Sequence, residues 1–332
     1  MTSPADAWRR LAPLTDLVTP MAVRVAATLR LADLIGDGVE RIGELADRTG
    51  TDADALGRVL RHLACHGVFA EPAPDRFALT GPAELLRSDH PAGMRAMFDL
   101  AEFGGRMDLA FTELMHTVRT GEPAWEAAFG APYWEHLAAD PALAASFDAS
   151  MAASTRTTAA TAYDWSGVRH VVDVGGGTGA LLAEVLRADP AIRATLVDLP
   201  GTVARGRRFL AEQGLADRCE FVGQSFFDPL PAGGDVYLLC AVLHDWNDEQ
   251  ATAILRRCAD AAGGNGRVVI VESHGTAGDD PAMFAEMNLR MLVLAGGRER
   301  GIDDYVRLAA AAGLPTATAS TTGSGLVIID CR

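Results

Sequence analysis

The stretch that decides the fold is VVDVGGGTGALL, residues 171–182. An apolar run typical of a buried β-strand leads into three successive glycines, then Thr178 and Gly179, and then an apolar helical pattern. Glycine adopts backbone conformations that other residues avoid, and it lets a ligand approach the main chain closely. A glycine turn at a helix N-terminus also presents free backbone N–H groups. The stretch therefore predicts a ligand-binding strand–turn–helix unit.

The spacing of the glycines narrows the choice of ligand. Gly175, Gly177 and Gly179 form a GxGxG turn, and the next strand-like run ends in Asp198. An acidic side chain at this distance after a glycine turn suits the hydroxyls of a ribose. With Ala180 the turn also satisfies the dinucleotide pattern GxGxxA. Two ribose-bearing cofactors are therefore open at this point, a nicotinamide dinucleotide and S-adenosylmethionine.

Strand-like and helical patterns alternate from residue 171 onward. The expected strands are 171–174, 194–198, 219–223, 235–240, 267–272 and one near 325–330. Such alternation predicts a Rossmann-like α/β domain, with a mostly parallel sheet and helices on both faces.

The first part of the sequence has a different pattern. Helical runs at 19–35 and 51–69, the second with Thr51 as the expected N-cap, precede two short strand-like pieces around a Pro-Ala-Pro-Asp turn. This order of helix, helix and ribbon is typical of a winged helix. We therefore expect a mainly helical winged-helix-like domain over 1–95, a helical substrate-lining connector over 96–165 and the α/β domain over 166–332.

Composition and charge limit the classes of function. The 332 residues carry a formal net charge of −15 at pH 7, which disfavours binding to a nucleic-acid backbone. No apolar run is long enough to span a membrane, and the N-terminus lacks the layout of a secretory signal. The five cysteines are scattered without a CxxC pattern, which argues against a zinc site or a disulfide framework. We expect a cytoplasmic protein without nucleic-acid or membrane partners and without a bound metal.

Polar side chains follow the fourth and fifth expected strands. DVYLLCAVL (235–243) runs directly into His244 and Asp245, and RVVIVE (267–272) ends in Glu272. Ligands of open α/β sheets bind at the carboxyl ends of the strands. If the two strands are neighbours, Glu272 lies close enough to His244 to fix its tautomer and stabilise its protonated form. His244 is then a candidate general base for a phenolic proton.

The third expected strand leads into a further candidate contact. In FVGQSFFDPLP (221–231), Phe226 could lie against an adenine face while Ser225 offers a hydrogen bond. Packing of Phe226 and Phe227 in the core is the alternative.

Together these motifs resemble one family. The residues that carry the resemblance are 175–179, Asp198, SFFDPLP (225–231), HDW (244–246), Glu272 and LRMLVLAGGRERGIDD (289–304). They are similar to those of small-molecule O-methyltransferases that use S-adenosylmethionine, which include plant phenolic enzymes and actinobacterial enzymes acting on aromatic polyketides. The resemblance covers nearly the whole chain. It implies a class I methyltransferase domain and a homodimer formed through the N-terminal winged helix.

The resemblance also implies a role for individual residues. His244 would be the base, oriented by Glu272 and Glu299. The residues implied at the cofactor, whose product form is S-adenosylhomocysteine, are Ser154, Asp173, Gly175, Gly177, Asp198, Leu199, Ser225, Phe226, Phe227 and Cys240. The residues implied at the acceptor are Phe147, Met151, Asp245, Asn288 and Met291. The chain departs from the family pattern at Ser225 and Asn288, where Asp is usual, and at Cys240, where plant enzymes have Lys.

The favoured function is therefore methyl transfer from S-adenosylmethionine to a hydroxyl of a small aromatic, polyketide-derived intermediate of antibiotic biosynthesis. Three alternatives stay open on the sequence. The methyltransferase fold could carry an altered reaction. GxGxxA with Asp198 could belong to an NAD(P)-dependent reductase. The winged helix, with 52–67 as recognition helix, could belong to a ligand-sensing regulator.

Overall fold

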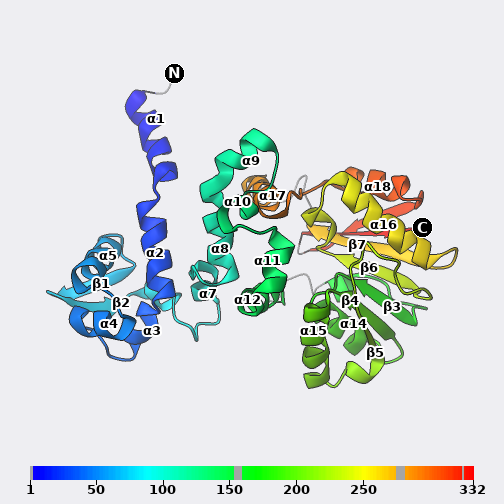
Figure 1. The fold of residues 1–332 in the computed structure, drawn as a ribbon, viewed down its shortest axis with the longest axis horizontal. Coiled ribbons are helices and arrows are strands. Elements are labelled where there is room, and N and C mark those ends of the chain that lie inside the picture. Colours follow the sequence, from blue (N-terminus) through cyan, green and yellow to red (C-terminus); the bar gives the residue numbers. More distant parts are fainter. Residues whose placement is uncertain (1–2, 153–158, 274–280, 324) are drawn as a thin grey trace. The chain divides into compact units, whose positions relative to one another are not determined.

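The chain folds into two compact units, Met1–Leu109 and Ala110–Arg332. The structure is a computed structural model and describes residues 3–152, 159–273, 281–323 and 325–332. Figure 1 shows the helices and strands of each unit. The expected division into 1–95, 96–165 and 166–332 stays a prediction.

The N-terminal unit is helical with one small ribbon. Its elements are α1 (Pro4–Leu11), η1 (Ala12–Thr15), α2 (Val18–Thr28), α3 (Leu31–Gly36), α4 (Ile42–Thr49), α5 (Ala53–Cys65), β1 (Phe69–Ala73), β2 (Arg76–Leu79), α6 (Gly81–Glu84), α7 (Met94–Phe98) and α8 (Phe103–Ala110). Leu31, Leu60 and Phe77 belong to a core that helices α3 and α5 share with the antiparallel ribbon. The expected N-cap was one residue off: Asp52, not Thr51, accepts a hydrogen bond from the backbone N–H of Ala55.

The second unit begins with short helices. They are η2 (Phe111–Glu113), α9 (Leu114–Thr120), α10 (Ala124–Phe129), α11 (Tyr133–Ala139), α12 (Pro141–Ala152) and α13 (Ala159–Ala162). The buried ring of Trp125 in α10 lies edge-on to Tyr133, which ties α10 to α11.

A seven-stranded sheet follows, in the order β5-β4-β3-β6-β7-β9-β8. Its strands are β3 (His170–Val174), β4 (Arg193–Asp198), β5 (Cys219–Gly223), β6 (Val236–Cys240), β7 (Arg267–Ser273), β8 (Ala317–Thr321) and β9 (Leu326–Cys331). The first five are parallel, and β9 is antiparallel to both β7 and β8. All six expected strands and the mostly parallel sheet are confirmed. β8 was not expected from the sequence, because this edge strand of small residues is largely exposed and lacks an apolar pattern.

Helices cover both faces of the sheet, as Figure 1 shows. They are α14 (Ala180–Ala188), α15 (Pro200–Glu212), α16 (Asp248–Ala262) and α18 (Ile302–Ala311). The short helices η4 (Ala216–Arg218) and η5 (Leu243–Asp245) lie in the connections, and α17 (Pro281–Ala295) packs with α9 and α10. Neighbouring residues of β3 face opposite cores, since Val171 packs with the α14 side and Val172 with the α16 side. A parallel sheet buried on both faces reads as the continuous apolar runs seen in the sequence.

The strand order creates the functional edge. Strands β6 and β7 are adjacent and parallel, with Cys240 opposite Val271, so the segments that follow them meet at one edge. The glycine turn after β3 lies at the same edge, because β3 pairs with β6 on the other side. Among the described residues, no helix combines the length and the apolar character that a membrane span needs.

Candidate active site

The glycine turn after β3 adopts the conformation that its sequence predicts. Gly175, Gly177 and Gly179 all have positive φ, at 69°, 59° and 80°. A Cβ atom on Gly175 would lie 2.8 Å from the Val242 side chain, so a larger residue fits neither the backbone nor the space. Helix α14 begins directly after Gly179. The turn thus places free helix N–H groups at the edge of the sheet.

Asp198 is fixed against this turn by two backbone donors. Its Oδ2 accepts from the N–H of Gly177 at 2.9 Å, and its Oδ1 accepts from the N–H of Leu199 at 2.7 Å. Burial raises the pKa of the Asp198 carboxyl, although both N–H donors favour its ionised form. The carboxylate is therefore held in one orientation, with lone pairs left to accept the hydroxyls of a ribose.

Asp173 is a buried carboxyl beneath the same turn. Neither of its oxygens has a hydrogen-bond partner among the described residues. Burial and the negative charge of Asp198 raise its pKa to about 7. An unpartnered buried carboxyl is costly unless a cation or a donor arrives. S-adenosylmethionine carries an ammonium group and a sulfonium, so the residues present suit this cofactor.

His244 lies in the one-turn helix η5, directly after β6. The residue is only 4% exposed, and its Nδ1 is 2.9 Å from Oε1 of Glu299. An ionised carboxylate can only accept, so Nδ1 carries a proton and Nε2 is the ring nitrogen left for chemistry. Burial opposes the charged ring, but Glu272, Asp245 and Glu299 outweigh it and raise the pKa of His244 to about 9.

The two glutamates implied by the sequence act differently on His244. Glu272, fully buried on β7, accepts from the backbone N–H of Leu243 at 2.9 Å and of His244 at 3.3 Å. It also lies within ion-pair distance of the ring, at 3.8 Å from Nδ1. Glu299 instead contacts the ring directly. One carboxylate therefore holds the turn, and the other holds the imidazole.

Asn288 on α17 supports Glu299. Its side-chain oxygen accepts from the backbone N–H of Glu299 at 2.9 Å. The resemblance implied a place for Asn288 at the acceptor, and the structure gives it this contact with the residue that is hydrogen-bonded to the His244 ring.

Aromatic side chains gather around Trp246, next to the η5 turn. The rings of Trp134 and Trp246 are stacked, with centroids 6.1 Å apart and planes 14° from parallel. Phe147 lies edge-on to Trp134, and Phe226 and Phe227 lie edge-on to Trp246. Neither tryptophan was expected from the sequence as a site residue. Trp246 stands in the quoted HDW motif, but nothing in the local sequence of Trp134 indicates the stack.

The remaining predicted positions lie as follows. Ser225 accepts from the backbone N–H of Phe227 at 3.2 Å, Cys240 ends β6, and Met291 is buried on α17. Met151 is exposed on α12. The contact implied for Ser154 lies outside the described residues. No group of His, Cys, Asp and Glu suited to a metal ion occurs in the described ranges.

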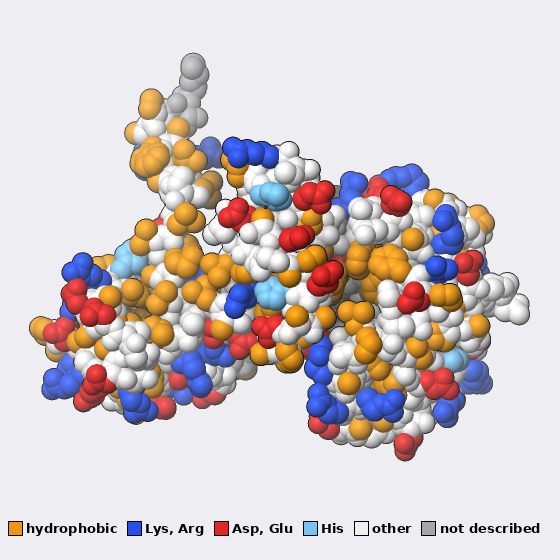
Figure 2. Space-filling model, viewed as in Figure 1, with side chains coloured by type: hydrophobic (Ala, Val, Ile, Leu, Met, Phe, Trp, Pro, Cys, Tyr) orange, Lys and Arg blue, Asp and Glu red, His pale blue; other side chains and the backbone are white. Residues whose placement is uncertain are grey.

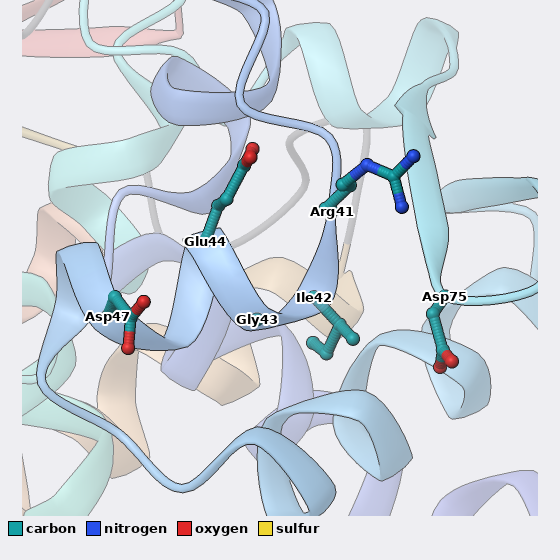
Figure 3. Close-up of a pocket in the computed structure, with 6 residues that line it drawn as sticks. All are labelled: Arg41, Ile42, Gly43, Glu44, Asp47 and Asp75. Carbon is teal, nitrogen blue, oxygen red and sulfur yellow. The ribbon is translucent and has the colours of Figure 1, made fainter.

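A concavity on the N-terminal unit, drawn in Figure 3, is a poorer candidate. Arg41, Ile42, Gly43, Glu44 and Asp75 are among the residues that line it. The carboxylate of Asp75 is already paired with Arg61. No group there is arranged for catalysis.

Comparison with known proteins agrees with this geometry. An O-methyltransferase domain family matches residues 111–315, and an O-methyltransferase dimerisation domain matches residues 13–89. A 2,7-dihydroxy-5-methyl-1-naphthoate 7-O-methyltransferase of Streptomyces carzinostaticus is 48% identical over 92% of both chains. Aclacinomycin 10-hydroxylase RdmB of Streptomyces purpurascens is 46% identical, over 96% of this chain and 87% of its own.

A solved structure of an O-methyltransferase is similar to this chain over nearly its whole length. NcsB1, an O-methyltransferase from neocarzinostatin biosynthesis in complex with S-adenosylmethionine and 2-hydroxy-5-methyl naphthoic acid, superimposes with a TM-score of 0.90 at 45% identity. The alignment covers 96% of this chain and 97% of that one. The chain belongs to the S-adenosylmethionine-dependent O-methyltransferases.

Proposed function

We propose that this protein methylates a hydroxyl group of a small, polycyclic aromatic acceptor of the hydroxynaphthoate type, in the biosynthesis of an aromatic polyketide. The observation that carries the proposal is the buried pair of His244 and Glu299 at the sheet edge that also holds Asp198 and the glycine turn. The similarity to a naphthoate 7-O-methyltransferase supports the acceptor class.

The cofactor supplies a methyl group that its sulfonium already activates. Asp198, held by the N–H of Gly177, would accept the ribose hydroxyls, and Asp173, whose oxygens have no partner among the described residues, would face a cationic group under the turn. Phe226, beside Gly175, offers an apolar ring face for the adenine. The other residues proposed to contact the cofactor are Gly177, Leu199, Ser225, Phe227, Cys240 and Ser154.

His244 would take the phenolic proton at Nε2. An ordinary phenol has a pKa near 10. Since the pKa of His244 is raised to about 9, the transfer of the proton from the phenol to the ring is nearly balanced. A cation bound at the same edge lowers the pKa of the ring, so binding of the cationic cofactor favours the neutral form that can act as base. General-base assistance of this kind is worth about 10²–10⁴-fold in rate.

The acceptor would lie among flat and adaptable side chains. Trp134, Trp246 and Phe147 provide ring faces and edges near His244. Met291 is buried on α17, a short distance before Glu299 in the sequence. Met side chains adapt to irregular apolar surfaces. Met151, Asp245 and Asn288 complete the proposed acceptor side.

The N-terminal unit is proposed to form the homodimer. Large apolar side chains project from its first helices: Leu14 is 82% and Leu17 is 80% exposed, and Trp8 and Val18 are also exposed. Figure 2 shows apolar side chains along these helices. An exposed apolar face of this kind is typical of an interface, and residues 13–89 match a dimerisation domain. The expected cytoplasmic location and the expected lack of nucleic-acid and membrane partners stay predictions.

The test is to incubate the protein with S-adenosylmethionine and a panel of hydroxynaphthoates and to follow S-adenosylhomocysteine and product mass. His244→Gln should bind S-adenosylhomocysteine as the wild type does and lose turnover. Unchanged turnover in this variant would remove His244 from its proposed role.

The similarity to a 10-hydroxylase makes a second reaction worth testing. Methylation adds one CH₂ unit to the acceptor, whereas hydroxylation adds one oxygen atom. Mass spectrometry of the same reactions therefore distinguishes the two. A product that gains oxygen and no CH₂ would overturn methyl transfer.

A further inference from the structure

The most completely buried cation near the site is Arg300, which the sequence analysis did not assign. It follows Glu299 in the sequence and is only 1% exposed. Its Nη1 donates to the carbonyl of Leu243 at 2.8 Å, and its Nη2 donates to the carbonyl of Trp246 at 2.7 Å. Its Nε and Nη2 also donate to Oδ1 of Asp248, at 3.0 and 2.8 Å. A guanidinium with this many bonds is fixed in position.

These acceptors lie on both sides of His244 in the chain. The carbonyl of Leu243 precedes it, and the carbonyl of Trp246 follows it. The backbone N–H of Arg298 donates to the carbonyl of His244 itself at 2.8 Å. This approach requires Gly297, because a Cβ atom there would lie 2.2 Å from the His244 oxygen. The segment that carries Glu299 is thus bound to the turn that carries His244.

The charges around the ring give Arg300 a second role. Carboxylates approach His244 from β7 (Glu272), from η5 itself (Asp245) and from the loop after α17 (Glu299). The ring of Tyr305 on α18 lies near Arg300, with the guanidinium carbon 6.0 Å from the ring centre.

Two further ionisable groups lie nearby. Tyr133 on α11 is close enough to Asp245 for the carboxylate to raise its pKa, after burial. Asp248 at the start of α16 pairs with Arg300 and with the more exposed Arg298. Arg300 is thus the buried guanidinium of this cluster, whereas Arg298 is largely exposed.

We propose that Arg300 is the positioning residue of this site: it clamps the carbonyls on either side of His244, keeps the imidazole on Glu299, and offsets the surrounding carboxylates. The part that concerns catalysis rests on the proposed function, because it takes His244 as the base. The part that concerns the geometry and protonation of His244 does not.

Two substitutions distinguish the effect of the Arg300 hydrogen bonds from the effect of its positive charge. Arg300→Met removes both the hydrogen bonds to the turn and the positive charge that offsets the surrounding carboxylates. Arg300→Lys keeps the charge, but one ammonium cannot reach both carbonyls and Asp248 together. In both variants the ring should leave its fixed contact with Glu299, so the pKa of His244 should fall below its wild-type value. Because Arg300→Met also lacks the cation, the pKa should lie higher in Arg300→Met than in Arg300→Lys. Arg256→Gln is the matched control, since Arg256 also donates to a backbone carbonyl, that of Ala311, but on the surface.

The measurement is nitrogen NMR of ¹⁵N-histidine-labelled full-length protein saturated with S-adenosylhomocysteine, with His244 assigned by its loss in His244→Gln. In both Arg300 variants the Nδ1 signal should move toward that of an unbound imidazole, and His244 should titrate at higher pH in Arg300→Met than in Arg300→Lys. Turnover on an acceptor that the wild type methylates should fall about 10²-fold in both variants, as expected for a small misplacement of a reacting group. The affinity for S-adenosylhomocysteine should stay within about twofold of the wild type.

Unchanged His244 signals and turnover in a folded Arg300→Lys would overturn the proposal and leave Arg300 a structural residue only. If the Arg300 variants do not fold, Asp248→Ala replaces them, since this side chain is half exposed and water can take its place. It should shift the His244 signals in the same direction, and unchanged signals would count against the clamp. If the wild type methylates no aromatic acceptor, the proposed function fails while the NMR result still decides the role of Arg300.

Discussion

Glu299→Gln should lower the pKa of His244 while keeping the hydrogen bond to its ring. The amide oxygen of glutamine can accept from Nδ1 as Oε1 of Glu299 does, at 2.9 Å. The substitution therefore removes a negative charge and little else. Glu272 and Asp245 remain at 3.8 and 3.7 Å from the ring nitrogens, so the pKa of His244 should stay partly raised.

The magnitude follows from the geometry. An opposite charge within about 4–6 Å shifts a pKa by about 1–3. The pKa of His244, about 9 in the wild type, should then fall to between about 6 and 8 in the variant. This corresponds to about 1.4–4 kcal/mol. The upper end agrees with the attraction of about 4 kcal/mol between unit charges 4 Å apart at an effective dielectric constant of about 20.

The rate should report this shift. If the neutral imidazole is the base, kcat/KM rises with pH as the ring loses its proton. The acid limb of the profile should therefore move to lower pH in Glu299→Gln. The plateau should be lower, because a ring with a lower pKa is a weaker base.

Stability gives an independent measurement. The folded-state pKa of about 9 lies above the ordinary value of 6.5, so the protonated ring stabilises the fold below pH 6.5 and loses this contribution as pH rises to 9. For the wild type this contribution is about 3 kcal/mol of the free energy of unfolding. Urea unfolding across this window should show a smaller loss in Glu299→Gln, completed at lower pH.

Glu286→Gln is the control, since this exposed carboxylate on α17 pairs with Arg290. It should leave both pH dependences unchanged. If Glu299→Gln kept both the acid limb of the kcat/KM profile and the pH window of the stability change at their wild-type positions, this would refute the effect of the Glu299 charge on the pKa of His244.

Three further predictions follow from the same geometry. Asp198→Ala should weaken binding of S-adenosylhomocysteine about 10- to 10²-fold by calorimetry, because hydrogen bonds to a charged group are worth about 1.5–3 kcal/mol each, and wild-type affinity would exclude Asp198 from the ribose site. Ala241 has a φ of +54° directly after Cys240, so Ala241→Gly should melt no lower than the wild type while Ala241→Val should lose about 1–2 kcal/mol; equal stabilities for the two variants would show that the backbone there is not strained. Turnover should persist in excess EDTA, and its loss with recovery on adding magnesium would reveal a metal requirement.

Much of the fold could be read from local pattern. Buried parallel strands appear as continuous apolar runs, and all six of those expected lie where the sequence placed them. The positive φ angles at Gly175, Gly177 and Gly179 are likewise a local property, because only glycine adopts them at little cost. The exposed edge strand β8 has no such pattern and was missed.

The sequence by itself determined which residues stand at the ends of strands, and so placed His244, Asp198 and Glu272 at one edge of a sheet. Only the tertiary structure decided which atoms of their partners they contact. Glu299 and Arg300, far along the chain from His244, reach its ring and its flanking carbonyls because the segment after α17 packs against the η5 turn. Local spacing follows from the repeat of a strand or helix along the backbone, whereas contacts between distant segments depend on how whole elements pack, which no short stretch of sequence specifies.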